Sequence, residues 1–538
     1  MRAVLKIRPN GTPSGGETQS ANRGARGHFV FPVLVSFLII ANLFSCRVRK
    51  LPPQVEPSAV PVSPVISAEE LFSRAEAELH KFTVPGYRAA VSYFEQALQL
   101  KPDLVMVYGR LAVAYGLWAR ERNDLGLDNL EQWVKSYYFT LRAKELGQVA
   151  DYLKASALTG NARSFISRRE YGEFFSTIKK RFAGESAELA LSYVRDLFST
   201  GQFKKEAINQ PLEALDRVLK DNPDEAEALV FKALVQVLTA EDPHLVRVME
   251  LRPDWSLPCF LLGLFYKSRG EVEQSEKWFN QVLGKNPDHP RAMAELGEMA
   301  FLGKKYEQAE KQLERALALD GEMPRAHLIV GLVLREKGEY DRALEHFQAI
   351  TTLVPDHEEA LYYQGLTLIE QADWPGSLEI LDSLVRIGSS YEIFGYALRA
   401  LSCLMLNRLA EAEADCRQAL ALSSNYYLPY YLLGLIHFRR EDWKKAAENF
   451  NQSLKIDRTF DDGHYYLGQT FLKLNDHKRA REELTRAAEL FEYEAGQAGQ
   501  LGLQARERGW SRKVELLLKR KNELEGKARH CRQLLASL

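Results

Sequence analysis

Small and large apolar residues recur between residues 256 and 490 with a period of 34 residues. Gly263, Gly297 and Gly331 stand 34 residues apart, and so do Gly434 and Gly468. A fixed period of this size is typical of a helix–turn–helix unit that is repeated along the chain. One such unit cannot bury its apolar face alone, so the copies must stack on one another. The pattern therefore predicts a solenoid of paired antiparallel helices.

The small residue of each copy marks the place where the two helices of a pair cross. Glycine inside a helix costs about 1 kcal/mol relative to alanine, so its recurrence at one position argues for close packing. Large residues such as Phe279, Phe347 and Phe450 are expected to fill the space around each crossing. The repeat positions are Gly263, Gly297, Gly331, Gly365, Gly434 and Gly468, with Pro287 and Pro355 ending second helices.

This combination of small, aromatic and proline positions resembles the tetratricopeptide repeat family, over seven consecutive copies in residues 256–490. The resemblance implies an all-α, right-handed superhelical solenoid that binds partners. Weaker copies near residues 71–103 and 224–254 extend the prediction toward the N-terminus. Residues 68–255 are therefore expected to form divergent helical repeats of the same kind.

Members of this family bind extended peptides or helices on a concave face that first helices line. Carried over residue by residue, this groove holds Phe260, Leu264, Arg291, Arg325, Tyr362, Leu366, Phe394, Leu401, Tyr431, Leu435, Phe438 and Tyr465. The Lys and Asn set with which some members grip a carboxylate is not found at these positions. Because the groove is mostly apolar, it suits a partner segment that is an amphipathic helix or an apolar stretch. About half of these side chains could instead be buried between neighbouring repeats.

The sequence of residues 1–46 predicts a signal or membrane-anchor segment. Arg23 and Arg26 precede an uncharged apolar run over residues 29–45, an order typical of a secretory signal. The segment that ends at Cys46 resembles a bacterial lipobox, which implies a lipid on Cys46 and an outer-membrane lipoprotein that faces the periplasm. A single-pass inner-membrane helix is the alternative, because the run reaches the short end of the ~17–25 residues that span a bilayer. A cleaved, soluble secreted protein is the third reading.

Two further segments flank the predicted repeats. Residues 47–67 are rich in proline and predict an extended linker. Residues 491–538 predict a glycine-rich hinge around Gly496, Gly499, Gly502 and Gly509, and then a helix. Apolar residues recur in that helix at steps of four and three, as in a heptad seam. It could cap the last repeat or form a coiled coil with a partner or with a second copy.

Composition and motifs narrow the function further. The chain of 538 residues is 46% hydrophobic and 27% charged with a formal net charge of −1, which argues against nucleic-acid binding. The sequence has no Gly-rich phosphate loop, HExxH, GxSxG or CxxC motif, so we expect neither catalysis, nor a cofactor, nor a metal site. Cys403 and Cys416 occupy facing positions of one repeat, either as buried thiols or as a disulfide.

Together these features predict a non-enzymatic protein-interaction scaffold that is tethered to a bacterial envelope membrane. Envelope, pilus and secretion assembly are the settings that such proteins usually serve. Two alternatives stay open at this point: a cytoplasm-facing regulator anchored in the inner membrane, and the accessory arm of a transferase complex.

Overall fold

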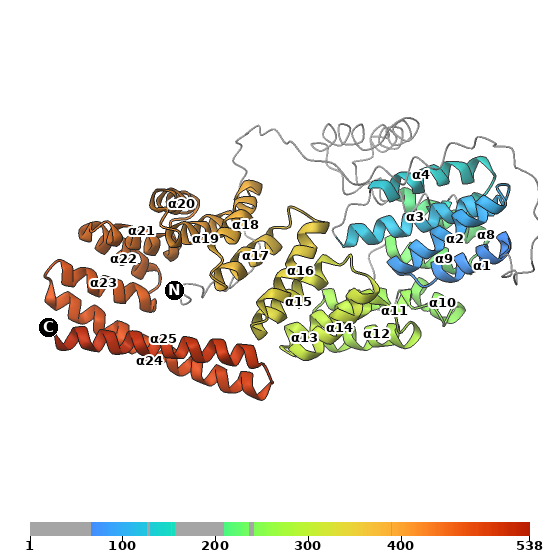
Figure 1. Cartoon of the computed structure of the whole chain (residues 1–538). Helices are drawn as coiled ribbons and strands as arrows, with labels where there is room; N and C mark the ends of the chain where they lie inside the picture. Colours follow the sequence, from blue (N-terminus) through green and yellow to red (C-terminus); the bar gives the residue numbers. More distant parts are fainter. Residues whose placement is uncertain (1–65, 126–129, 152, 156–208, 236–241, 389) are drawn as a thin grey trace, which may run out of the picture. The chain divides into compact units, whose positions relative to one another are not determined.

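The computed structural model describes residues 66–125, 130–151, 153–155, 209–235, 242–388 and 390–538. Helices and turns account for all regular structure in these ranges, which confirms the all-α prediction. The N-terminal helices are α1 (Ala68–Leu79), α2 (Val84–Leu100), α3 (Met106–Asp124), α4 (Leu130–Glu145), α8 (Asn209–Asp221), α9 (Ala226–Val235) and α10 (Pro243–Leu251). The pairs α1–α2 and α3–α4 are helical hairpins, and α9 packs on both α8 and α10 (Figure 1).

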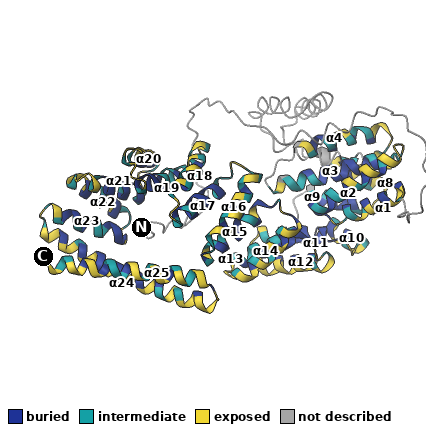
Figure 2. Cartoon of the chain, in the orientation of Figure 1, coloured by how far each residue is buried: buried dark blue, intermediate teal, exposed yellow. Residues whose placement is uncertain are grey.

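The regular repeats follow as seven helix pairs. They are α11 (Leu257–Ser268) with α12 (Val272–Lys285), α13 (Pro290–Leu302) with α14 (Tyr306–Leu319), α15 (Pro324–Lys337) with α16 (Tyr340–Leu353), α17 (Glu358–Glu370) with α18 (Trp374–Ile387), α19 (Glu392–Met405) with α20 (Leu409–Leu422), α21 (Tyr427–Arg439) with α22 (Trp443–Ile456), and α23 (Asp461–Lys473) with α24 (His477–Glu507). Each second helix also packs on the first helix of the next pair. In Figure 2 the buried residues of these helices are coloured dark blue along the ribbon.

The periodic glycines lie where the two helices of a pair cross. A Cβ atom added to Gly331 would lie 2.5 Å from Cε1 of Phe347, and one added to Gly434 would lie 2.5 Å from Cε1 of Phe450. Both phenylalanines are fully buried. Gly263, Gly297, Gly365 and Gly468 each face Phe or Leu of their second helix in the same way. Only a residue without a side chain allows the backbone and the large residue to approach so closely.

The short turns within the repeats have a shared form. In three pairs the turn contains a non-glycine residue with positive φ, such as Glu441 at 60°, followed by an aspartate. The carboxylates of Asp373, Asp442 and Asp476 accept hydrogen bonds from backbone N–H groups in the first turn of α18, α22 and α24. These N-caps satisfy donors that the helix itself leaves free, and so set where each second helix begins.

A buried charge network joins the N-terminal helices. Glu227 of α9 accepts hydrogen bonds from Nη2 of Arg110 at 2.7 Å and from Nζ of Lys154 at 2.6 Å. Arg110 of α3 also donates to Glu76 of α1, with 2.6 Å between Nε and Oε1. Burial alone would raise the pKa of Glu227, but Arg110 and Lys154 hold that pKa well below its usual value. The carboxylate therefore stays ionised and links three segments that are distant in sequence.

The C-terminal segment differs from the predicted hinge. Helix α24 continues through Gly496, Gly499 and Gly502, and the chain turns only at Gly509, whose φ is 73°. Helix α25 (Ser511–Ala536) then packs along α24. The hinge prediction is wrong for Gly496, Gly499 and Gly502, because packing against α25 outweighs their poor helix propensity, whereas at Gly509 the chain does turn. The apolar seam of α25 is occupied within the chain, by α24. Self-association through this helix stays a prediction.

Several sequence predictions lie partly or wholly outside the described residues. The anchor over residues 1–46, with Cys46, and most of the linker over residues 47–67 belong to that part of the chain. None of the helices that the structure describes combines the length and the apolar character needed to cross a bilayer. Cys403 and Cys416 are both described, and they are buried free thiols. Burial raises the pKa of Cys403 to about 11, which disfavours the reactive thiolate.

Candidate binding surfaces

The twelve predicted groove residues divide into two groups by exposure. Six of them are buried between neighbouring helices, and these are Phe260, Tyr362, Leu366, Leu401, Tyr431 and Leu435. The other six keep exposed surface, and these are Leu264, Arg291, Arg325, Phe394, Phe438 and Tyr465. The buried group holds repeats together and offers no outer surface to a partner; of its members, Phe260 also lines the cavity described below. A binding surface on the first helices must therefore use the second group.

Charged side chains connect the first helices of the early repeats. Nζ of Lys267 in α11 lies 2.6 Å from Oε2 of Glu298 in α13. Nη2 of Arg325 in α15 lies 2.8 Å from Oε1 of Glu298, and its Nη1 lies 3.8 Å from Oε2 of Glu359 in α17. We call these four residues the charge ladder. Burial opposes ionisation of Glu298, but Lys267 and Arg325 lower its pKa. The ladder thus neutralises its own charges across four repeats.

Aromatic side chains replace the charges from α17 onward. The ring centroids of Tyr362 and Tyr391 lie 5.3 Å apart, those of Phe394 and Tyr426 5.6 Å, and those of Tyr427 and Phe460 5.0 Å. We call the connected set the aromatic chain; it consists of Tyr362, Tyr391, Phe394, Tyr426, Tyr427, Tyr431 and Phe460. Aromatic pairs at these distances are favourable beyond their buried area. The aromatic chain therefore joins four successive repeats through their first helices.

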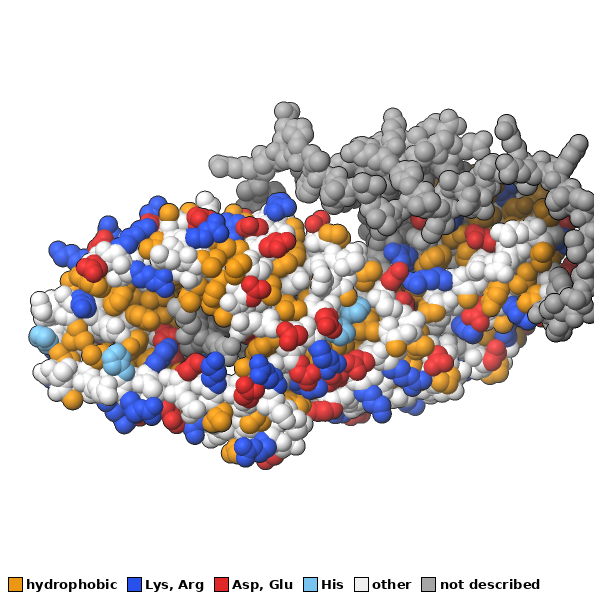
Figure 3. Space-filling model, viewed as in Figure 1, with side chains coloured by type: hydrophobic (Ala, Val, Ile, Leu, Met, Phe, Trp, Pro, Cys, Tyr) orange, Lys and Arg blue, Asp and Glu red, His pale blue; other side chains and the backbone are white. Residues whose placement is uncertain are grey.

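Three aromatic residues in this half of the array, Phe394, Phe438 and Tyr465, keep part of their surface exposed, and we call them the aromatic surface. Phe394 belongs to α19, Phe438 to α21 and Tyr465 to α23, so three successive first helices contribute one residue each. Phe438 rests on Trp443 with 5.1 Å between ring centroids. The Tyr465 hydroxyl lies 2.8 Å from Nδ1 of His530 in α25. Figure 3 shows hydrophobic side chains gathered over α17–α22 and mixed charges over α13–α16.

The tip of the C-terminal hairpin contacts a much earlier repeat. Nε1 of Trp510 donates to Oε1 of Glu307 in α14 at 2.9 Å, and its ring lies 5.6 Å from that of Tyr306. Leu516 of α25 packs against Gly338, where an added Cβ would lie 2.7 Å from its Cδ1. Trp510 is the first apolar residue of the four-three pattern in the C-terminal segment, yet its side chain packs on α14. Sequence periodicity contains no signal for a contact between residues so far apart.

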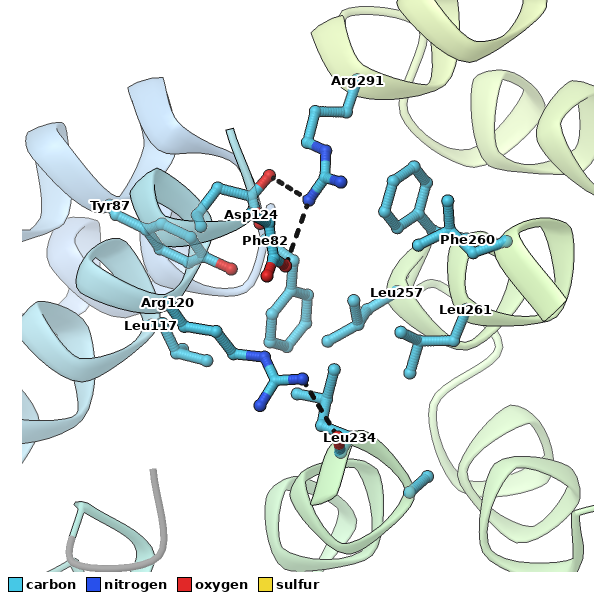
Figure 4. Close-up of a pocket in the computed structure, with 13 residues that line it drawn as sticks. Phe82, Tyr87, Leu117, Arg120, Asp124, Leu234, Leu257, Phe260, Leu261 and Arg291 are labelled. Carbon is cyan, nitrogen blue, oxygen red and sulfur yellow. Dashed lines mark hydrogen bonds and ion pairs between the residues drawn. The ribbon is translucent and has the colours of Figure 1, made fainter. Parts of the chain in front are cut away.

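A cavity of about 200 Å³ lies where the N-terminal helices meet the regular repeats (Figure 4). Its lining comes from the α1–α2 turn and from α2, α3, α9, α11 and α13, and comprises Phe82, Tyr87, Leu117, Arg120, Glu121, Asp124, Ala233, Leu234, Leu257, Phe260, Leu261, Leu264 and Arg291. The predicted groove residues Phe260, Leu264 and Arg291 are thus brought together here. The other lining residues were not predicted, because no local pattern relates segments this distant in sequence.

The charged residues of the cavity have different surroundings. Nη1 of Arg291 lies 2.9 Å from Oε1 of Glu121 and 3.7 Å from Oδ2 of Asp124. Arg120 instead donates from Nη2 to the backbone carbonyl of Leu234 at 3.0 Å. Burial raises the pKa of Glu121, while Arg291 opposes that effect. Within the described residues, no cluster of three or more His, Cys, Asp or Glu side chains has the arrangement of a metal site.

Comparisons with known proteins identify the repeats. Family models of the tetratricopeptide repeat match residues 260–324, 302–358, 331–392 and 427–460. A search of curated proteins found no match. Among solved structures, MamA is 22% identical with a TM-score of 0.28, covering 33% of this chain and 96% of its own. PilW, a type IV pilus biogenesis factor, is 17% identical with a TM-score of 0.34, covering 37% and 91%. Yeast Tom70 is 16% identical with a TM-score of 0.30, covering 76% and 96%.

Proposed function

We propose that this chain, a tetratricopeptide repeat protein, is a non-enzymatic interaction scaffold that holds an apolar or amphipathic segment of a partner protein. The observation that carries the proposal is the partly exposed aromatic surface of Phe394, Phe438 and Tyr465 on three successive first helices. Aromatic residues give large contact areas and are enriched among the residues that dominate binding energy. Side chains spaced along successive helices suit the anchors of a bound helix or an extended segment.

The charge ladder supports the choice of an apolar partner segment. Lys267, Glu298, Arg325 and Glu359 already pair with one another, so their charges offer little net attraction to a charged peptide. A partner would have to break these pairs in order to use them. The aromatic half requires no such exchange, because Phe394 and Phe438 only lose water on binding.

The experiment that tests this function is photo-crosslinking from single positions in the full chain, in the native cell. Benzoylphenylalanine replaces Phe394 or Phe438, and mass spectrometry identifies the peptide that becomes attached. We expect one partner segment with apolar residues at helical or alternating spacing at both positions. The aromatic surface is the contact area, so adducts should be abundant there.

Two matched controls locate the contact. Phe301 is a partly exposed aromatic residue on α13, in the half that carries the charge ladder. Val272 is an exposed apolar residue on the second helix α12, with 58% of its surface accessible. Equal crosslinking to the same segment from Phe301 and Val272 would remove the aromatic half as the binding site. An adduct peptide rich in charge and poor in apolar residues would contradict the proposed partner class.

We further propose that the N-terminal segment tethers this scaffold to a bacterial envelope membrane, with Cys46 as the lipid-bearing residue. The apolar run of residues 29–45 and the lipobox-like segment that ends at Cys46 support this proposal. In this setting the scaffold would serve envelope, pilus or secretion assembly. An inner-membrane anchor with a cytoplasmic partner and an accessory role beside a transferase are the alternative proposals.

Metabolic palmitate labelling of the wild type and of Cys46→Ala tests the tether. We expect a labelled wild-type chain whose mature N-terminus is Cys46, and no label on Cys46→Ala. An unlabelled chain that keeps its residues before Cys46 and stays in the membrane fraction would show a spanning helix instead. Release of the wild type into the soluble fraction would reject both kinds of anchor.

A further inference from the structure

We propose that the cavity between α3, α9, α11 and α13 is a second binding site, which takes one apolar group carrying a carboxylate. The site lies at the N-terminal end of the regular repeats, and its lining shares none of the residues of the aromatic half. It therefore does not rest on the function proposed above. The ligand chemistry follows from the lining, from its charges and from its size.

Most residues of the cavity wall are apolar and already packed. Phe82, Leu257 and Leu261 are 2%, 7% and 6% exposed, and Phe260 and Leu117 are equally buried. Phe260 is held from behind by His289, whose ring is stacked on it with 5.0 Å between centroids. Walls of this kind keep their shape without a ligand, which lowers the cost of ordering the site on binding.

Among the described residues, one positive group of the lining, Arg120, forms no ion pair with a carboxylate. Both carboxylates, those of Glu121 and Asp124, lie beside the guanidinium of Arg291. Arg120 has five N–H donors. Its guanidinium donates to the neutral carbonyl of Leu234, and its charge lowers the pKa of Glu121 without forming an ion pair with that carboxylate. An anion is therefore the group that would best complement Arg120, and a guanidinium binds a carboxylate through two parallel hydrogen bonds.

A second polar group points into the same space. Figure 4 shows the hydroxyl of Tyr87 on the side of the cavity that Arg120 and Asp124 also face. Tyr87 is 3% exposed, and the charges of Glu121 and Arg120 both act on its hydroxyl. Burial, and then the charge of Glu121, raise the pKa of this phenol, so it remains a neutral donor. A hydroxyl donor beside a guanidinium is a suitable pair for a carboxylate oxygen.

The volume limits the ligand to about one residue. The cavity of about 200 Å³ is smaller than the roughly 300–1,000 Å³ of sites for drug-sized ligands. An aromatic or branched side chain with its carboxylate fits this description. Such a group can come from a free small acid or from the last residue of a protein chain. These two sources share one chemistry, and the probes below separate them.

The experiment is fluorine NMR on the full chain with three probes. Para-fluorophenylacetate represents a free acid, N-acetyl-para-fluorophenylalanine represents a chain end, and the carboxamide of the second compound removes only the charge. We expect both acids to bind and the carboxamide to bind at least about tenfold more weakly. The acid that binds more tightly identifies the source of the natural ligand.

Variants place the binding in this cavity. Arg120→Met should weaken the acids at least about tenfold and leave the carboxamide nearly unchanged, because only the charged contact is lost. Arg315→Met is the matched control, since Arg315 is an exposed arginine on α14 that pairs with Asp288. If Arg120→Met fails to fold, Tyr87→Phe retains the ring and removes one donor, and it should weaken the acids several-fold.

Three results would overturn the proposal. The first is equal binding of the acid and its carboxamide, which would show that the site does not recognise charge. The second is unchanged acid affinity in Arg120→Met or Tyr87→Phe with an unchanged melting temperature. The third is the absence of binding by either acid at millimolar concentration. None of these results bears on photo-crosslinking at Phe394 and Phe438, so the two proposals fail separately.

Discussion

The two halves of the first-helix face differ in chemistry although they share one backbone plan. From α11 to α17 neighbouring repeats are joined by Lys267, Glu298, Arg325 and Glu359, whereas from α17 to α23 they are joined by aromatic rings. Six of the seven pairs, in both halves, have the same crossing, with a glycine of the first helix against Phe or Leu of the second. The repeat thus determines how two helices pack, and leaves the first-helix face free to become a polar or an aromatic surface.

The largest difference between the halves should appear when one residue of each is truncated. Tyr431 is 2% exposed and its ring centroid lies 4.7 Å from that of Phe460, so Tyr431→Ala leaves a cavity between repeats. We expect a loss of about 3–5 kcal/mol in the free energy of unfolding. Glu298→Ala removes only partly exposed ion pairs and should cost about 1 kcal/mol. Urea unfolding followed by circular dichroism measures both, and equal losses would refute the distinction.

A substitution at the shared crossing should affect both halves alike. Gly331→Ala and Gly434→Ala each place a Cβ at 2.5 Å from a buried phenylalanine, and the resulting overpacking should cost about 1–3 kcal/mol. Gly284→Ala is the control, because no atom lies within 4 Å of its added Cβ. That variant should be neutral or up to about 1 kcal/mol more stable. Melting temperatures would contradict this interpretation if Gly284→Ala were as destabilised as the other two.

Acid should lower the free energy of unfolding through protonation of His289, which caps α13 in the charge-ladder half. Nδ1 of His289 accepts a hydrogen bond from the N–H of Ala292 at 3.2 Å and so caps α13. Burial, and then Arg291, lower the pKa of His289 from 6.5 to about 3. The unfolded chain therefore binds the proton first. The stabilising contribution of neutral His289 is present above pH 6.5 and is lost as the pH falls. The free energy of unfolding should drop by about 1 kcal/mol between pH 6.5 and 5.5.

The variant His289→Asn isolates this effect. Asparagine can cap a helix but does not titrate, so the variant should retain its stability over the same pH interval better than the wild type, by about 1 kcal/mol. Urea midpoints at the two pH values provide the measurement. Parallel losses in wild type and variant would assign the acid sensitivity to other groups.

The smallest expected effect is the salt dependence of the ladder. Glu298→Gln removes the charge but keeps the shape, and should cost about 0.2–1 kcal/mol at low ionic strength. The Debye length falls to about 3 Å in 1 M salt, so the loss should shrink there. Arg325, with 57% of its side chain exposed, makes the pair accessible to ions. Phe438→Ala in the aromatic half should show no such salt dependence, and a matching response would contradict the comparison.

Much of the fold follows from local sequence. The positions of Gly263, Gly331 and Gly434 locate each helix crossing, because a period of 34 residues and a small residue at one place describe a single packing event. The sequence also predicts that about half of the groove residues are buried between repeats. It does not predict which of them are buried. The glycines at 496, 499 and 502 were misread as a hinge, because the stabilising partner, α25, follows later in the chain.

The sequence by itself determined the type of unit, its length and the residues at its helix crossings, since each depends on neighbours within one period. Only the tertiary structure decided which surfaces the units share. Arg120 and Arg291 line one cavity although 171 residues separate them (291 − 120), and Trp510 rests on Tyr306 from another helical hairpin. Such contacts arise from the way successive units stack and turn, and that geometry accumulates over many repeats, so no local pattern records it.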